Sequence, residues 1–362
     1  MRYSPFRHLG SIFHKRPIHF TLFLTRRCNA RCSFCFYHAH EEIVDNNAEL
    51  TLAEIEKVAG SMGSLLWLAF SGGEIFLRRD LVDITRIFYK KNSPALILFP
   101  TNGLLTERIA ENVEAVLRDC PKSTIIVKLS LDGPEQLHDS IRGVHGCYKK
   151  TMATCGALAP LLDRYPHFEL GINTVFCREN QDHILELIDF VGQLEQVKTH
   201  TVSLIRGDAA NLGPARVDLR KYHAAITCLE NNLKKRSAPI YRFGGARLKA
   251  AQDILQRRLI NKTVIEEKAQ LPCYAGRLNL VLTENGDLFP CESFSMRLGN
   301  VRQDGYDIRE LLRSDRARQA IASINRQGCF CTHECYMMTN ILFNPHQYPA
   351  LFKEYLQLRH HA

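Results

Sequence analysis

The stretch Thr25-Arg-Arg-Cys28-Asn-Ala-Arg-Cys32-Ser-Phe-Cys35 places three cysteines at the spacing C-x3-C-x2-C. It follows directly after an apolar run, residues 18–24, that is typical of a buried strand. Three thiolates can hold three irons of a four-iron cluster and leave the fourth iron open to a small molecule. Three thiolates with a distant fourth ligand would instead make a zinc site. The spacing therefore predicts a metal centre at the end of the first strand.

Five further apolar runs follow, and stretches with helical periodicity lie between them. These runs span residues 66–70, 96–99, 124–131, 170–176 and 199–205. A capping box, Thr51 to Glu54, predicts the start of the first intervening helix. Six strands that alternate with helices indicate repeated βα units and a parallel sheet. Such a sheet either curls into a partial barrel or winds as an open sheet, and the periodicity does not choose between the two.

The composition is that of an ordinary globular protein, with 362 residues, 45% of them hydrophobic and 23% charged. No run approaches the roughly 18 apolar residues of a membrane-spanning helix, and the first residues lack the apolar core of a secretory signal. We therefore expect a cytoplasmic protein. The net charge of +9 favours an anionic partner, but the basic residues are spread along the chain and give no clear nucleic-acid or membrane signal.

The thirteen cysteines carry more information than the charge. Disulfides are disfavoured in the cytosol, so clustered cysteines indicate metal binding or catalysis. Five cysteines near the end of the chain form a second group: Cys273, Cys291, Cys329, Cys331 and Cys335. Five others are scattered singly, and we expect them to be small buried hydrophobes: Cys120, Cys147, Cys155, Cys177 and Cys228.

Turn residues organise the second cysteine group. Asn285-Gly286 between apolar runs predicts a tight β-hairpin, which would bring Cys273 and Cys291 near one another. The other three cysteines follow at the spacing C-x-C-x3-C. Five thiols suffice for one fully ligated four-iron cluster with one thiol to spare. A zinc ribbon is the alternative for this group.

The first cysteine group, with Phe34 just before its last cysteine, resembles the signature of the radical S-adenosylmethionine (SAM) superfamily. The second predicted strand ends in Ser71-Gly72-Gly73-Glu74, which matches the family segment that binds the amino group of SAM. The resemblance implies an α/β fold, a partial (β/α)6 TIM-like barrel. It also implies a [4Fe-4S] cluster on Cys28, Cys32 and Cys35, with SAM at the open iron.

The same resemblance assigns further SAM contacts at later strand ends. Asn102 follows the third strand, and Ser130 and Asp132 follow the fourth, where the family's polar residues reach the ribose. Arg142 is expected either to pair with the SAM carboxylate, since a guanidinium matches a carboxylate as a fork, or to lie on the surface. Asn173 on the fifth strand is a further expected contact, although the sequence does not say whether its side chain points inward.

Residues 271–345 resemble the SPASM/Twitch extension that follows many radical SAM cores, including its G-x4-C element at Gly286 and Cys291. A full SPASM domain has seven cysteines and two auxiliary clusters, whereas this segment has five cysteines and departs from the usual C-x2-C-x5-C-x3-C. We therefore expect one auxiliary [4Fe-4S] cluster. Cys273 and Cys291 are its firmest expected ligands, Cys331 and Cys335 its closing pair, and Cys329 a spare or alternative.

The expected organisation has five parts. They are an N-terminal extension (1–17), the radical SAM core (18–214), a helical connector (215–270), a small C-terminal iron–sulfur domain (271–345) and a tail (346–362).

The resemblance implies reductive cleavage of SAM to a 5′-deoxyadenosyl radical, which takes a hydrogen atom from a substrate. An electron donor such as flavodoxin or ferredoxin is implied as a partner. The substrate is expected to be either a ribosomally made peptide or a sugar, lipid or other small molecule, and no residue acting on it is assigned. A non-catalytic iron–sulfur or zinc protein that serves electron transfer or scaffolding is the alternative from a different class.

Overall fold

The predicted parallel sheet is present in the computed structural model, which describes residues 3–11, 16–37, 49–206, 217–235, 237–324, 326 and 329–358. Six parallel strands lie side by side in chain order: β1 (His19–Phe23), β2 (Trp67–Ser71), β3 (Leu96–Thr101), β4 (Thr124–Ser130), β5 (Phe168–Phe176) and β6 (Thr199–Leu204). β6 forms one edge of the sheet and does not pair with β1 in the described residues, so the barrel is incomplete. The fold is the predicted partial barrel of βα units.

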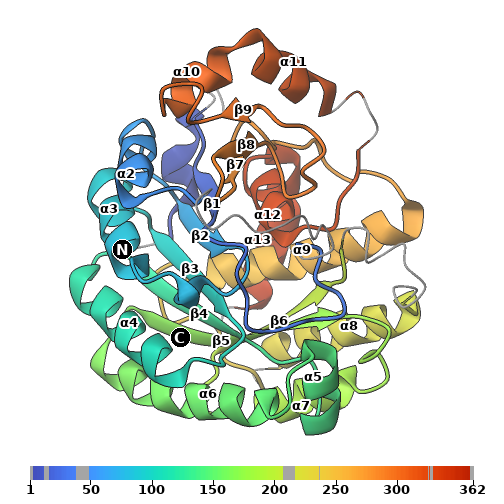
Figure 1. Cartoon of the computed structure of the whole chain (residues 1–362). Coiled ribbons are helices and arrows are strands. Elements are labelled where there is room, and N and C mark those ends of the chain that lie inside the picture. The colour runs from blue at the N-terminus through green and yellow to red at the C-terminus, as the bar shows by residue number, and fades with distance from the viewer. Residues whose placement is uncertain are drawn as a thin grey trace.

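Helices connect the strands and cover the outer side of the sheet (Figure 1). They are α2 (Leu52–Gly60), α3 (Leu81–Asn92), α4 (Thr106–Asp119), α5 (Glu135–Arg142), α6 (Cys147–Arg164) and α7 (Ile184–Gly192). α2 begins with both halves of the predicted capping box, because the Thr51 side chain accepts from the Glu54 amide and the Glu54 carboxylate accepts from the Thr51 amide. The local start signal and the tertiary structure therefore agree.

The second cysteine group extends the same sheet. β7 (Asn279–Leu282) pairs in parallel with β1, and β8 (Asp287–Phe289) pairs antiparallel with β7. The predicted hairpin at Asn285-Gly286 is confirmed, and Gly286 has the positive φ of 90° that such a turn needs. β9 (Gly299–Asn300) completes the nine-stranded sheet, and α10 (Ile308–Arg313), α11 (Asp315–Ile324), α12 (Glu334–Leu342) and α13 (Tyr348–Gln357) follow it.

The predicted connector contains two helices, α8 (Leu219–Lys234) and α9 (Ala246–Glu266). α9 lies across the inner side of the sheet and packs against α12 and α13 (Figure 1). Its apolar residues Ala250, Ile254 and Ile260 are buried in the main hydrophobic core. α9 thus helps to close the open barrel, and the domain boundaries at 214 and 270 stay a prediction.

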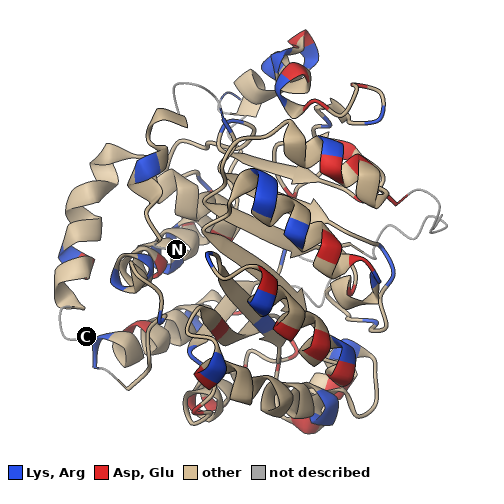
Figure 2. Ribbon diagram, turned by 90° about the vertical axis from the view of Figure 1, so that its left-hand side faces the viewer, with Lys and Arg blue, Asp and Glu red and all other residues tan. Residues whose placement is uncertain are grey.

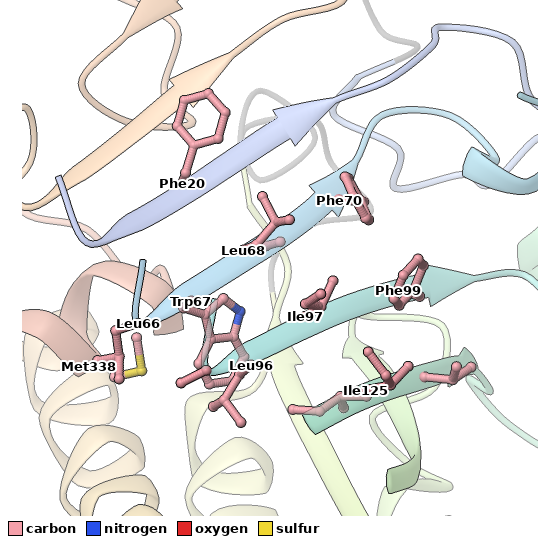
Figure 3. Packing of buried hydrophobic residues seen from close by; sticks show 14 of the residues in the cluster. Phe20, Leu66, Trp67, Leu68, Phe70, Leu96, Ile97, Phe99, Ile125 and Met338 are labelled. Carbon is pink, nitrogen blue, oxygen red and sulfur yellow. The ribbon is translucent and has the colours of Figure 1, made fainter. Parts of the chain in front are cut away.

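The core is continuous across the strands. Figure 3 shows Trp67 and Leu96 at the starts of β2 and β3, near Met338 of α12, and Phe70 and Phe99 toward the ends of the same strands. The single cysteines Cys120, Cys147, Cys155 and Cys177 are buried as predicted, whereas Cys228 is only half-buried.

Charged residues of both signs are mixed on the surface. Figure 2 shows Lys and Arg interspersed with Asp and Glu along the outer helices on the face in view. Among the helices that the structure describes, none is both long and apolar enough to cross a membrane.

Candidate active site

The three cysteines of the first group lie on a loop that leaves the carboxyl end of β1. The Arg31 amide donates to the Arg142 carbonyl at 2.8 Å, and the Ser33 amide donates to the Ile141 carbonyl at 3.0 Å. These bonds hold the loop against the end of α5. Cys28, Cys32 and Cys35 all line one cavity of about 400 Å³, a volume typical of ligand sites.

Hydrogen-bond donors surround two of these sulfur atoms. The Ala30 amide donates to Cys28 Sγ at 3.4 Å, and Asn102 Nδ2 lies 3.9 Å from the same sulfur. Arg142 Nη1 donates to Cys32 Sγ at 3.5 Å. Donors at these positions stabilise thiolates, the form in which cysteine binds metal. This donor set fits the predicted iron–sulfur cluster.

Burial keeps two of these thiols protonated when no metal is bound. Burial raises the pKa of Cys28 to about 11 and also raises the pKa of Cys32, so cluster binding must displace protons. No disulfide joins any of the thirteen cysteines, all of which lie in the described ranges. Within those ranges, no three His, Cys, Asp or Glu side chains are arranged as ligands of a single metal ion.

The Gly72-Gly73-Glu74 segment lies directly against the cysteine loop. The Gly73 amide donates to the Thr25 carbonyl at 2.7 Å, and the Glu74 amide donates to the Arg27 carbonyl at 2.9 Å. Gly72 has a φ of 117°, in the region that favours glycine. A Cβ on Gly73 would lie 2.6 Å from the Arg27 carbonyl carbon. Glycine is required here because two backbones are in contact.

Glu74 is buried and lines the cavity. Its carboxylate accepts hydrogen bonds from the Asn102 amide at 2.8 Å, Thr101 Oγ1 at 2.9 Å and the Phe76 amide at 3.2 Å. Burial raises the pKa of Glu74 to about 7. A carboxylate has about four acceptor positions, so capacity remains for the SAM ammonium group that the family resemblance implies.

Ser130, Asn173 and Asn102, the other expected SAM contacts, also line the cavity, and their contact with SAM stays a prediction. Asn173 points inward, which the sequence left open, and its Oδ1 accepts from Ser203 Oγ at 3.3 Å. Asn102 Nδ2 donates to Asn29 Oδ1 at 2.7 Å and so ties the end of β3 to the cysteine loop.

Asp132, for which the resemblance implies a ribose contact, is buried and lies behind the cavity wall; the contact itself stays a prediction. One carboxylate oxygen accepts from Arg142 Nε at 2.6 Å, and the other accepts from the Val175 amide at 3.0 Å. Arg142 is held against this carboxylate, with its guanidinium 5.3 Å from the centre of the Phe34 ring. Arg142 is thus buried and not on the surface. Asp132 contributes to the site by holding the Arg142 guanidinium in place.

We expect Asp132→Asn to destabilise the protein, because the substitution leaves the buried Arg142 charge without a counter-charge. Breaking a buried ion pair typically costs about 3–5 kcal/mol. The temperature of thermal unfolding should therefore fall clearly, whereas Asp163→Asn on the exposed side of α6 should leave it almost unchanged. Equal unfolding temperatures for the two variants would contradict this role of Asp132.

The second cysteine group gathers beside the first. Cys35, Cys273, Cys291, Cys331 and Cys335 all pack against one small hydrophobic cluster that includes Phe23, Phe289 and Tyr336. Burial, together with the neighbouring Cys273, Cys291 and Cys329, raises the pKa of Cys331 to about 12. Cys335 differs from these four because it lines the cavity. Cys329, the predicted spare thiol, thus lies near the other three, and the ligand set of this group stays a prediction.

An ion-pair network joins the end of β6 to the two segments that carry Cys291 and Cys335. Arg206 contacts Glu292, which follows Cys291, with Nη1 to Oε2 at 3.6 Å, and it also pairs with Glu334, which precedes Cys335. His333 joins the network, with its Nδ1 3.6 Å from Glu292 Oε2 and 3.1 Å from Arg206 Nη1. Arg206, Glu292 and Glu334 all line the cavity, so the second group forms part of its wall.

Several cavity residues were not predicted from the sequence. Lys249, Asp253 and Arg257 share one face of α9 through their four-residue spacing, and all three line the cavity together with Lys128 of β4. This spacing is visible in the sequence, but the direction in which the face points depends on how α9 crosses the barrel.

Family models match both the sheet that carries the first cysteine group and the C-terminal segment that carries the second. The radical SAM superfamily model matches residues 22–191, and the model of the SPASM iron–sulfur cluster-binding domain matches residues 273–336. The chain is a radical SAM enzyme with a C-terminal SPASM domain. Its cofactors are accordingly SAM and iron–sulfur clusters, in the core and in the auxiliary domain.

Individual relatives of this radical SAM enzyme differ in what they make. An AdoMet-dependent heme synthase of Methanosarcina barkeri is 28% identical over 295 residues, 78% of this chain and 79% of the synthase. The antilisterial bacteriocin subtilosin biosynthesis protein AlbA of Bacillus subtilis is 26% identical over 306 residues, 82% of this chain and 60% of AlbA.

The fold also matches solved structures of SuiB from Streptococcus suis. SuiB bound to S-adenosylmethionine has a TM-score of 0.61 at 16% identity, covering 88% of this chain and 71% of SuiB. SuiB bound to the precursor peptide SuiA has a TM-score of 0.59 at 15% identity, covering 92% of this chain and 74% of SuiB. At this identity the likeness concerns the fold alone.

Proposed function

We propose that this radical SAM enzyme cleaves SAM reductively and removes a hydrogen atom from a substrate held in the cavity between the cysteine loop and α9. The observation that carries the proposal is the convergence of Cys28, Cys32, Cys35 and the Gly72-Gly73-Glu74 segment on one cavity. The cluster and SAM supply the radical chemistry when bound. The protein's own residues hold these groups, orient the substrate and exclude water.

Each part of the site has a separate task in this proposal. The three thiolates hold the cluster, and Glu74 accepts hydrogen bonds from the SAM ammonium group. Arg142 donates to Cys32 Sγ and is fixed by Asp132. The SPASM segment closes one side of the cavity through Glu292, Glu334 and Cys335. Its cluster would exchange electrons with the substrate, and a flavodoxin or ferredoxin would reduce the core cluster.

Two substrate classes have support. A ribosomally made peptide is supported by the relatives AlbA and SuiB, the second of which binds a precursor peptide. A small molecule is supported by the heme synthase and by the polar groups that α9 contributes to the cavity wall. The abundance of cysteine thiols suits a reducing compartment, and we place the enzyme in the cytoplasm.

Formation of 5′-deoxyadenosine from SAM tests the reaction. Anaerobically reconstituted protein with a strong reductant should form it, and an extract fraction that contains the substrate should increase the yield. An increase from the low-molecular-weight fraction would favour a small molecule, whereas an increase from the peptide fraction would favour maturation. No product from protein with intact clusters, with either fraction, would contradict the proposal.

The auxiliary site has its own test in Cys291→Ala. If the SPASM segment holds one four-iron cluster, this variant should lose about half of the bound iron and keep the core cluster. Iron content and visible absorbance measure the loss, and Cys228→Ala, which changes a lone half-buried thiol, serves as the control. Unchanged iron content would contradict a cluster at this position.

A further inference from the structure

The end of the cavity opposite the cysteine loop is charged and polar. Its wall combines strand residues with one face of α9: His19, Trp67, Lys128, Lys249, Asp253 and Arg257. We call these six residues the cavity floor. His19 and Trp67 are the first residues of β1 and β2, whereas Ser71 and Gly72 of the SAM segment follow at the far end of β2.

The cavity floor carries three cations and one carboxylate. Asp253 is already paired with Lys249 and accepts a hydrogen bond from the Tyr241 hydroxyl at 3.0 Å. Lys128 donates to Thr199 Oγ1 at 2.6 Å and Thr201 Oγ1 at 3.2 Å, and Arg257 Nη2 donates to the His200 carbonyl at 3.3 Å. In the described part of the chain, neither Lys128 nor Arg257 forms an ion pair with a carboxylate. Lys128 and Arg257 are therefore two basic groups of the cavity floor without a carboxylate partner.

Three buried groups on the cavity floor also lack acceptors among the described residues: Arg257 Nη1, Trp67 Nε1 and His19 Nε2. The arginine and tryptophan groups can only donate. His19 Nδ1 lies 3.1 Å from the Asn279 amide nitrogen, which donates to it, so Nε2 carries the ring proton. Buried donors without acceptors are unfavourable, and these three add to the donor-rich character of this part of the cavity wall.

The fold makes room for the Lys128 ammonium group. Its neighbour across the sheet is Gly171, and a Cβ there would lie 2.6 Å from Lys128 Nζ and 2.7 Å from the Thr199 carbonyl oxygen. Burial lowers the pKa of Lys128 to about 7, and a bound anion would favour the charged form. An anion bound next to Lys128 would therefore keep its ammonium group charged.

We propose that the cavity floor binds an oxyanion, a carboxylate or phosphate, at one end of a small-molecule substrate whose other end reaches the SAM site. This inference rests on the proposed function. Trp67 and Ser71 are four residues apart on β2, which corresponds to about 13 Å along a strand. The hydrogen is therefore removed from a carbon several bonds away from the anionic group. An Asp or Glu side chain of a peptide whose backbone lies at the SAM end is too short to span this length.

The chain offers a direct reporter, because Trp67 is its only tryptophan. Trp67 fluorescence of the reconstituted holoenzyme is titrated at constant ionic strength with inorganic phosphate and, separately, with acetate. We expect a saturable change with at least one of them, and the anion that saturates identifies the phosphate or carboxylate class. Arg257→Gln should weaken the binding about tenfold or more, because a charge-assisted hydrogen bond is lost.

Lys262→Gln is the matched control, because it removes an exposed lysine from the same helix. It should leave anion binding unchanged, and Lys128→Met provides a second floor variant if Arg257→Gln does not fold. The inference is overturned if neither anion gives a saturable change, or if both floor variants bind as the wild type does. Formation of 5′-deoxyadenosine by the same wild-type preparation separates the two proposals. If the product forms and the anions do not bind, only the floor inference fails.

Discussion

Cys35→Ala is expected to abolish the formation of 5′-deoxyadenosine from SAM. The substitution removes one of three thiolates that the sequence places at C-x3-C-x2-C and that the structure places on one cavity. An iron without its protein ligand leaves the cluster open to loss, and SAM then has no site of reduction. We expect product to fall below detection, and the iron bound to the core site to fall with it.

Two measurements on the same protein separate loss of the cluster from loss of the fold. Iron content and visible absorbance report the cluster, and far-ultraviolet circular dichroism reports the helices. Cys228→Ala, at a lone half-buried cysteine of α8, should keep both the iron and the activity. If Cys35→Ala forms product at the wild-type rate, the first cysteine group is not the site of SAM cleavage.

Gly73→Ala is expected to have an effect nearly as large without removing any ligand. The added methyl group would lie 2.6 Å from the Arg27 carbonyl carbon and 2.8 Å from the Arg26 carbonyl oxygen. Backbone atoms cannot move aside as a flexible side chain can, so the Gly72-Gly73-Glu74 segment must separate from the cysteine loop. The bond from the Glu74 amide to the Arg27 carbonyl would break, and Glu74 would move away from the SAM site.

We expect Gly73→Ala to bind SAM at least about tenfold more weakly, which corresponds to about 1.4 kcal/mol. Equilibrium dialysis with SAM measures this, and product formation should fall in parallel. Gly63→Ala is the control, because a Cβ at Gly63 meets nothing within 4 Å. Unchanged SAM binding by Gly73→Ala would mean that the segment does not contact SAM.

The SPASM segment is built into the same sheet as the radical SAM core. β7 pairs with β1, the strand that leads into the cysteine loop, so the two cysteine groups are anchored to neighbouring strands. Arg206 joins β6 to Glu292 and Glu334 beside the second group. A change in either cysteine group is therefore expected to alter the cavity as well as its own metal.

The sequence by itself determined the order of the βα units, the hairpin at Asn285-Gly286 and the chemistry at the ends of β1 and β2. These features are local, because hydrophobic period, turn residues and ligand spacing are set over a few neighbouring positions. The cysteine spacing and the Gly-Gly-Glu segment were recognisable for the same reason.

Only the tertiary structure decided where the side chains of distant segments meet. It placed Asp132 behind the cavity wall, Asn173 inside it and Cys335 on its surface. It also turned the charged face of α9 onto Lys128 and Trp67, although in the sequence α9 reads as part of a connector. These relations depend on how β7 and α9 complete an open barrel, and packing between residues far apart in the chain has no local signal.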